Sequence, residues 1–255
     1  MKTLKKNAHK TRLAAAASLI GFFVLGGGAV QLRAQRAPVT VQTEIVTRNT
    51  GSKQEQAKQA GDPSNVVVWL TPLQSPGALR LPGNLPKLMQ RNKAFEPHVL
   101  AIQAGSSIEF PNRDPFFHNV FSLFDGKRFD LGLYEAGTSK TARFDRVGVS
   151  FLFCNIHAGM SAVVVAVDTP YFALSDRDGR VNIPGVPDGR YRLHVWYERS
   201  LPEDLQTLER DVEISSSARA LGSIRVMLNP NWNLAHKNKY GQDYVSPPSA
   251  GYTNP

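Results

Sequence analysis

The segment VSFLFCNIHAGMSAVVVAV, residues 149–167, carries the strongest structural signal in the chain. Val149 to Cys154 and Ala162 to Val167 are rich in β-branched and aromatic residues, so they predict two strands joined by a short loop. The second strand is apolar at every position. This pattern is typical of a strand that is covered on both faces.

Strand alternation sorts the side chains of the first strand onto two faces. If Cys154 points into a core, Leu152 and Ser150 point inward with it, and Phe151 and Phe153 lie on the opposite face. Two neighbouring aromatic rings rarely face water. We therefore expect a second sandwich or a partner subunit to cover Phe151 and Phe153.

The loop between the strands offers metal ligands at the spacing Cys-x2-His-x2-Met, as Cys154, His157 and Met160. Cys154 is the only cysteine, so it cannot form an intramolecular disulfide, and metal ligation is a good reason for its presence. His118 is the expected fourth ligand, because alternation in its strand points it inward with apolar neighbours. The alternative for His118 is a structural histidine bonded to a carbonyl group.

These ligand types favour copper. Thiolate and thioether are soft donors that suit Cu(I), and imidazole suits both oxidation states of copper. The set leaves no open position for a substrate, and the chain lacks the His-x-His pairs of multicopper enzymes, so we expect no enzymatic activity. The other histidines outside the N-terminal segment, His98, His194 and His236, are assigned structural or solvent roles.

Charge is concentrated at the N-terminus. Six basic residues and no acidic ones lie in residues 1–34, so the rest of the chain carries +3 of the formal net charge of +9. We draw no inference of nucleic-acid binding from this balance. A lysine-rich start, an apolar stretch over residues 13–30 and a polar end near Ala34 predict a signal peptide. The mature protein is then periplasmic or secreted, and it meets the membrane only if residues 1–34 stay uncleaved as an anchor.

The rest of the chain predicts an all-β protein, because short strand patterns alternate with turn signals and no window has a long helical period. Residues 229–255 lack a core pattern, and we expect an extended or disordered tail there. The expected strands are Val39 to Thr47, Val66 to Leu70, His98 to Gln103, Ser107 to Phe110, Phe117 to Phe121, Thr141 to Phe144, Val149 to Cys154, Ala162 to Val167, Arg190 to Tyr197 and Gly222 to Leu228.

Residues 84–168 resemble a small cupredoxin, on the segments Phe95 to Leu100, Gly105 to Asn112 and His118 to Val120 together with the ligand loop. The short loop is similar to that of amicyanins. The resemblance implies a Greek-key β-sandwich and one type 1 copper ion held by the four side chains His118, Cys154, His157 and Met160. It also implies single-electron transfer to a c-type cytochrome or a dehydrogenase that docks near His157.

A second resemblance covers residues 170–193, which are similar to the centre of a carboxypeptidase-regulatory-like or Cna-B-like β-sandwich. Residues 39–75 would supply its first strands and residues 169–228 the remainder. The cupredoxin is then an insertion into a split sandwich.

Three functions remain open from the sequence. The first is an exported type 1 blue copper protein that carries single electrons. The second is a copper-binding chaperone or storage protein. The third is a metal-free extracytoplasmic β-sandwich that acts as an adhesion module.

Overall fold

The structure is a computed structural model that describes residues 37–47, 61–74, 83–123 and 126–244. In these ranges the protein consists of strands and one short helix, α2 (Pro202–Gln206), so the predicted all-β class is confirmed. The predicted signal segment, residues 1–34, lies outside the described residues. Within them, no helix is long and apolar enough to cross a membrane.

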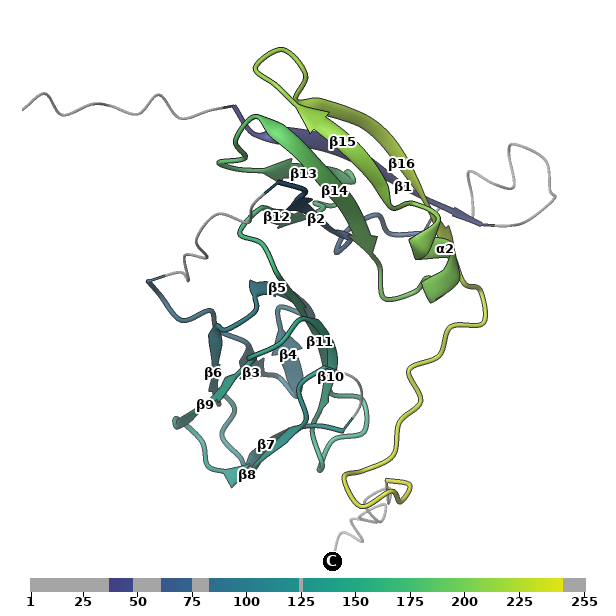
Figure 1. Cartoon of the computed structure of the whole chain (residues 1–255). Coiled ribbons are helices and arrows are strands. Elements are labelled where there is room, and N and C mark those ends of the chain that lie inside the picture. The colour runs from purple at the N-terminus through teal and green to yellow at the C-terminus, as the bar shows by residue number, and fades with distance from the viewer. Residues whose placement is uncertain (1–36, 48–60, 75–82, 124–125, 245–255) are drawn as a thin grey trace, which may run out of the picture. The chain divides into compact units, whose positions relative to one another are not determined.

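The strands follow one another along the whole described chain (Figure 1). They are β1 (Val39–Thr47), β2 (Val67–Pro72), β3 (Met89–Arg91), β4 (Ala94–Glu96), β5 (Val99–Gln103), β6 (Ser107–Pro111), β7 (His118–Ser122), β8 (Phe129–Tyr134), β9 (Ser139–Arg143), β10 (Gly148–Phe153), β11 (Ser161–Val167), β12 (Phe172–Leu174), β13 (Arg180–Ile183), β14 (Gly189–Trp196), β15 (Arg210–Ile214) and β16 (Ala220–Leu228).

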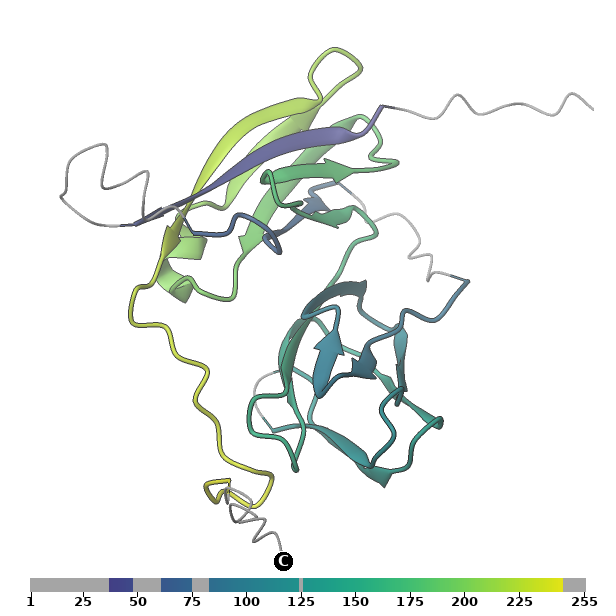
Figure 2. The ribbon, with the colours of Figure 1, turned by 180° about the vertical axis from the view of Figure 1, so that it is seen from behind.

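Strands from the two ends of the described chain form one sandwich, which we call the outer sandwich. One sheet has the order β13-β1-β16 and the other has the order β12-β2-β14-β15. β1 runs antiparallel to β13 and parallel to β16, whereas β2 is antiparallel to both β12 and β14. The two early strands therefore pair with strands that come much later in the sequence, as the view from behind also shows (Figure 2).

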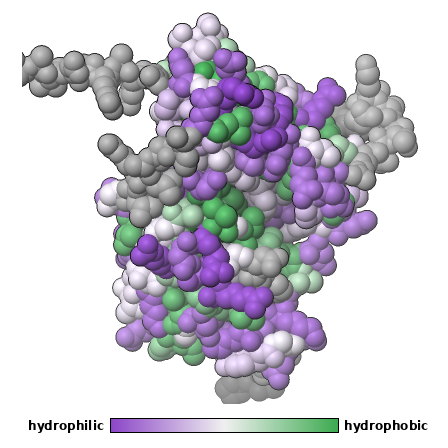
Figure 3. All heavy atoms as spheres, in the orientation of Figure 1, coloured by the Kyte–Doolittle hydropathy of each residue, from purple (hydrophilic) through white to green (hydrophobic). Residues whose placement is uncertain are grey.

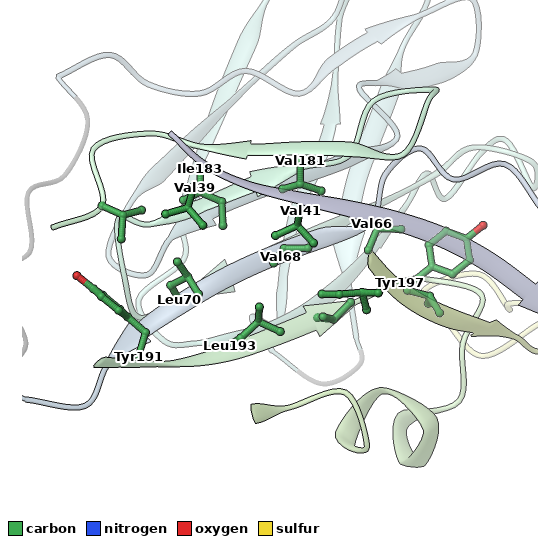
Figure 4. Packing of buried hydrophobic residues seen from close by; sticks show 14 of the residues in the cluster. Val39, Val41, Val66, Val68, Leu70, Val181, Ile183, Tyr191, Leu193 and Tyr197 are labelled. Atoms are coloured by element: carbon green, nitrogen blue, oxygen red, sulfur yellow. The ribbon is translucent and has the colours of Figure 1, made fainter. Parts of the chain in front are cut away.

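The two sheets of the outer sandwich share an apolar core. On β1 the side chains of Val39, Val41 and Ile45 are buried, while Thr40 and Glu44 between them are exposed. This alternation follows directly from the two-residue period of a strand. Figure 4 shows the β1 side chains meeting those of β2 and β14 between the sheets.

Strands β3 to β11 form a second body, which we call the inserted unit because it lies between β2 and β12 in the sequence. Its main sheet has the order β5-β11-β10-β7-β8, and the pairs β3-β4 and β6-β9 complete it. Isolated bridges, Lys87 to Glu109 and Gln90 to Asn112, join these two pairs. A core that includes Phe110, Phe144 and Leu152 fills the space between the layers.

β11 is covered on both faces, as its uninterrupted apolar sequence predicts. Ala162, Val164 and Ala166 belong to the core of the inserted unit. The alternate residues Val163 and Val165 belong to a different cluster, which also contains Val67 of β2.

The two phenylalanines of β10 are covered by different parts of the chain. Phe151 packs in the same cluster as Trp69 of β2 and Trp196 of β14, so the expected cover by the outer sandwich is confirmed for this ring. Phe153 is buried but stacks on His236, with ring centroids 3.8 Å apart. Phe153 is therefore covered, as expected, but the ring that stacks on it comes from the segment after β16 and not from a strand of the outer sandwich.

The described part of this last segment, residues 229–244, has no strand or helix, as expected for an extended tail. Hydrogen bonds from His236, Lys239 and Tyr244 nevertheless hold it on the inserted unit. The surface drawn in Figure 3 shows hydrophobic residues in groups that are separated by hydrophilic ones. Phe117 and Ile156 are among the large apolar residues that remain exposed, at 55% and 46%.

Candidate metal centre

Two neighbouring strands bring the predicted ligands together. His118 is the first residue of β7, and Cys154 directly follows β10, which pairs with β7 through Phe153 and Phe121. The loop from Cys154 to the start of β11 is closed by its own backbone. The amide of Cys154 donates to the carbonyl oxygen of Met160 (3.2 Å), and the amide of Met160 donates to that of His157 (3.0 Å).

Three of the four predicted side chains meet at one point. The Cys154 sulfur lies 3.7 Å from Nδ1 of His118 and 3.6 Å from Nδ1 of His157. These three atoms lie within 4.8 Å of one another, and they are the group of His, Cys and acidic side chains in the described residues that is arranged to hold a metal ion.

The spacing fits a metal ion at the centre of the three atoms. For a first-row metal such as zinc, bonds of about 2.3 Å to a thiolate and about 2.0 Å to an imidazole, at about 120°, place sulfur and nitrogen about 3.7 Å apart. The two measured separations match this value. The donor set of two imidazoles and a thiolate is that of a trigonal copper site.

Met160 is fully buried and belongs to the same apolar cluster as Cys154. The loop thus directs the thioether and the thiolate into one core. A thioether is a weak ligand at a trigonal copper site of this kind.

Asp114 fixes the orientation of His118. Its carboxylate accepts a hydrogen bond from Nε2 of His118 (2.7 Å), which leaves the other ring nitrogen, Nδ1, facing Cys154 and free to bind a metal once it is deprotonated. Asp114 is buried and also accepts hydrogen bonds from the amides of Asn92 (2.6 Å) and Lys93 (2.9 Å). Sequence reasoning missed Asp114, because nothing in its neighbourhood distinguishes it from a solvent-facing turn residue.

The electrostatics of the site favour a thiolate. Burial alone would raise the pKa of Cys154, but hydrogen bonds from His118 and from the amides of Asn119, Ile156 and His157 outweigh it and lower the pKa. Burial would lower the pKa of His118, but Cys154 and Asp114 together raise it. The negative thiolate is therefore stabilised before any metal is considered.

His157 differs from His118 in its surroundings. It is only partly buried, and its ring lies 4.9 Å from that of His118 and 5.6 Å from that of Phe116. Burial and then the positive charge of His118 lower the pKa of His157, so its neutral form is favoured. A neutral imidazole is the form that binds a metal.

The remaining histidines are placed elsewhere. His98 contacts Glu198, His194 stacks on Trp69, and His236 contacts the ligand loop from the tail. Sequence reasoning gave His236 only a structural or solvent role and had no signal for its contact with the loop.

No known family model and no curated protein matches the chain. Among solved structures, the chain is similar to a novel purple cupredoxin from Nitrosopumilus maritimus, at 21% identity and a TM-score of 0.30 over 32% of this chain and 99% of that chain. It is also similar to a Cu-containing nitrite reductase from Thermus scotoductus, at 22% identity and a TM-score of 0.32 over 37% of this chain and only 26% of that one. A reduced amicyanin mutant matches at 19% identity and a TM-score of 0.31, over 40% and 99% of the two chains.

Proposed function

We propose that His118, Cys154, His157 and Met160 bind one copper ion as a type 1 site and that the protein carries single electrons between redox partners. The observation that supports this most is the spacing of the cysteine sulfur, 3.7 Å and 3.6 Å from two imidazole nitrogens. Hard cations such as Mg²⁺ and Ca²⁺ prefer oxygen ligands, whereas this cluster offers nitrogen and sulfur. A buried thioether beside it adds a soft donor that favours copper.

Each residue has a separate role in this proposal. Copper, when bound, supplies reversible one-electron transfer. Cys154 provides the thiolate, and Asp114 holds His118 in one tautomer and one orientation. His157 lies at the partly exposed edge of the site, and Met160 would supply a weak thioether donor from the core. Two backbone hydrogen bonds, from Cys154 to Met160 and from Met160 to His157, keep the three loop ligands near one another.

The test is a spectrum of the purified chain loaded with Cu(II). We expect an intense visible thiolate-to-copper absorption and a reversible one-electron reduction. Cys154→Ser is expected to remove the colour while circular dichroism shows an intact fold. Unchanged spectra in Cys154→Ser would refute the assignment of the ligands.

A matched pair of histidine variants separates ligands from other histidines. His118→Asn is expected to abolish the absorption, whereas His194→Asn is expected to keep it, since His194 stacks on Trp69 in the outer sandwich. Loss of colour in both variants would show that the absorption does not report on the proposed site.

The same measurements distinguish the other two functions. Tight Cu(I) binding without reversible oxidation would identify a copper chaperone or storage protein. A folded chain that stays colourless with Cu(II) would favour a metal-free adhesion module. Since the proposed ligand set leaves no position for a substrate, we propose no enzymatic activity.

We also propose that a redox partner, such as a c-type cytochrome or a dehydrogenase, docks beside His157. Ile156 is exposed next to His157 in the loop, and the ring of Phe116 contacts the ring of His157. Phe117, which follows Phe116 in the sequence, is also exposed. A small apolar surface of this kind suits a transient interface. Phe117→Ser is expected to slow electron exchange with the partner and to leave the copper spectrum unchanged, as stopped-flow kinetics can measure.

Export is part of the proposal, since the N-terminal segment has the features of a signal peptide. Expression in a bacterial host followed by mass spectrometry of the periplasmic fraction tests it. A product that begins near residue 35 is expected. A full-length chain in the membrane fraction would indicate an uncleaved anchor.

A further inference from the structure

The last described segment, residues 236–244, contacts the ligand loop at three points. His236 Nε2 lies 2.9 Å from the carbonyl oxygen of Ala158, and the amide of Lys239 donates to Oδ1 of Asn155 (3.0 Å). The hydroxyl of Tyr244 donates to the carbonyl oxygen of Cys154 (2.8 Å). Three residues of the loop are thus held by a segment that comes about eighty positions later in the sequence.

The same segment is anchored on the strands that carry the site. The His236 ring stacks on Phe153, the residue before Cys154, with centroids 3.8 Å apart. The Tyr244 ring meets the edge of the His236 ring at 5.2 Å. A stacked pair of this kind contributes to stability beyond the apolar area it buries.

Lys239 extends the anchor to β8. Its ammonium group lies 2.8 Å from a carboxylate oxygen of Asp130, whose other oxygen accepts a hydrogen bond from Asn119 (2.7 Å). Asn119 follows His118 in β7. The segment is therefore linked through Asp130 to the residue that follows His118, in addition to its direct contacts around Cys154.

The segment has a defined conformation of its own. The amide of Asn238 donates to the carbonyl of Gln242 (2.8 Å), and the Asn238 side chain accepts the amides of Tyr240 (2.9 Å) and Gln242 (3.0 Å). Gly241 has a φ of 77°, a conformation that glycine adopts without strain. Asn and Gly at these positions are typical turn residues, so the sequence specifies the turn locally.

The loop needs such support. Ile156, Ala158 and Gly159 are exposed, and the loop has few backbone hydrogen bonds of its own. Exposed loops with few internal contacts open most easily. We propose that residues 236–244 form a strap that holds residues 154–160 in the metal-binding conformation in the absence of metal and slows the release of bound metal.

The metal-free part of this inference stands on the contacts alone, whereas its metal-release part rests on the proposed function. The decisive comparison uses two chains, one that ends at Leu234 and lacks the strap, and one that ends at Tyr244 and keeps it. In the metal-free proteins, hydrogen exchange of the amides in residues 154–160 is expected to be about tenfold faster in the chain ending at Leu234. Equal exchange rates in the two chains would overturn the proposal.

Point variants exclude a general loss of fold. Tyr244→Phe removes one hydroxyl, and we expect about fivefold faster exchange around Cys154, which is the effect of one lost hydrogen bond. Tyr240→Phe is the matched control, because the ring of Tyr240 is exposed. Exchange within β14 serves as the internal reference and is expected to stay unchanged. An equal response of Tyr244→Phe and Tyr240→Phe would contradict the role of the hydroxyl.

With copper bound, the chain ending at Leu234 is expected to lose the metal to a chelator several-fold faster than the chain ending at Tyr244. Equal release rates would overturn the metal-release part. The hydrogen-exchange comparison needs no copper. It therefore tests whether the strap holds residues 154–160 even if the full chain gives no copper absorption.

Discussion

Among single residues, Asp114 links the turn between β3 and β4 to His118 of the candidate metal centre. Its carboxylate holds the amides of Asn92 and Lys93 and the ring of His118 at the same time. Asn92 and Lys93 have positive φ values of 55° and 58°, which non-glycine residues rarely adopt. The hydrogen bonds to Asp114 stabilise the conformation of this turn. The same bonds hold the Asp114 carboxylate against His118.

Replacing Asp114 by asparagine tests whether Asp114 orients His118 and whether its negative charge affects the site. Asp114→Asn is expected to lower the Cu(II) affinity about 10- to 100-fold, the range found for residues that orient ligating histidines. It should also raise the reduction potential, because a buried negative charge that stabilises the oxidised site is lost. Competition titration and voltammetry measure the two effects.

Asp145→Asn is the control, since Asp145 is 48% exposed and pairs only with Lys127 on the surface among the contacts described. The Cu(II) affinity and the reduction potential of the Asp145→Asn variant are expected to equal those of the unaltered chain. An Asp114→Asn protein with the same affinity and potential as Asp145→Asn would remove Asp114 from the site.

Met160 provides a second test at this scale. Met160→Gln is expected to keep a copper site and to lower its reduction potential, because the axial ligand tunes the potential. The amide also costs about 1–3 kcal/mol of stability, since Met160 lies in an apolar cluster. Met227→Gln in β16 serves as the control for the voltammetric measurement, and an equal potential in both variants would show that Met160 is not a ligand.

The loop residues were open to prediction because Cys154, His157 and Met160 are neighbours in sequence, so their spacing alone implies a shared site. His118 followed from strand alternation. The environment of Asn119 was not predictable: its side chain is buried and its amide nitrogen donates a hydrogen bond to Asp130. Contacts between distant segments set its environment, and one sequence does not reveal them.

At the scale of elements, the hairpin of β10 and β11 has the core of the inserted unit, with the candidate metal centre, on one face and residues of the outer sandwich on the other. One face carries Cys154 and Leu152 into the core of the inserted unit, and the other presents Phe151 to Trp69 and Trp196. β10, which leads directly into the ligand loop at Cys154, therefore contacts both bodies.

Phe151→Ala tests this packing. We expect the free energy of unfolding to fall by about 2 kcal/mol, less than for a fully buried phenylalanine because Phe151 is only partly buried. The copper absorption is expected to remain. Chemical denaturation provides the measurement, and Phe117→Ala, an exposed ring, is expected to change stability by less than about 0.5 kcal/mol. Equal stability of the two variants would contradict the packing role of Phe151.

The long apolar or alternating strands were predictable, and β1 has the bounds that its pattern indicates. The missed strands, β3, β4, β8, β12, β13 and β15, are short or largely exposed. A three-residue strand such as β12 has no measurable period, and its pairing with β2 comes from the packing of the sandwich. Helix α2 has five residues, too few for a helical period to appear.

For the described chain as a whole, the feature of interest is a histidine–carboxylate pair at the junction between the two bodies. The chain leaves the outer sandwich after β2, builds the inserted unit and returns at β12. Few polar contacts join the two bodies, and one of them is His98, which precedes β5 and meets Glu198, which follows β14. Nε2 of His98 lies 2.7 Å from the Glu198 carboxylate, and Nδ1 lies 3.2 Å from the carbonyl oxygen of Ser161.

Both nitrogens of His98 face acceptors, so the doubly protonated ring satisfies both contacts. The hydrogen bond to Glu198 is the main cause that raises the pKa of His98 above its ordinary value of 6.5. A raised folded-state pKa means that the protonated form favours the folded state. The stabilisation is therefore fully present below pH 6.5 and is lost as the pH rises through the folded-state pKa. His98 is 42% exposed, so the effect is expected to be modest.

His98→Gln tests this at the scale of the molecule. Urea denaturation from about pH 5 to about pH 9 is expected to show that the unaltered chain is more stable than the variant at low pH and that the difference shrinks as the pH rises. Glu198→Gln should produce the same loss, and adding it to His98→Gln should change little, because the two substitutions remove one contact. The difference in stability between the unaltered chain and His98→Gln falls with rising pH only if the protonated form of His98 holds the junction. A difference that grows with pH, or one that is constant across the range, would contradict the pairing of His98 with Glu198 as a link between the inserted unit and the outer sandwich.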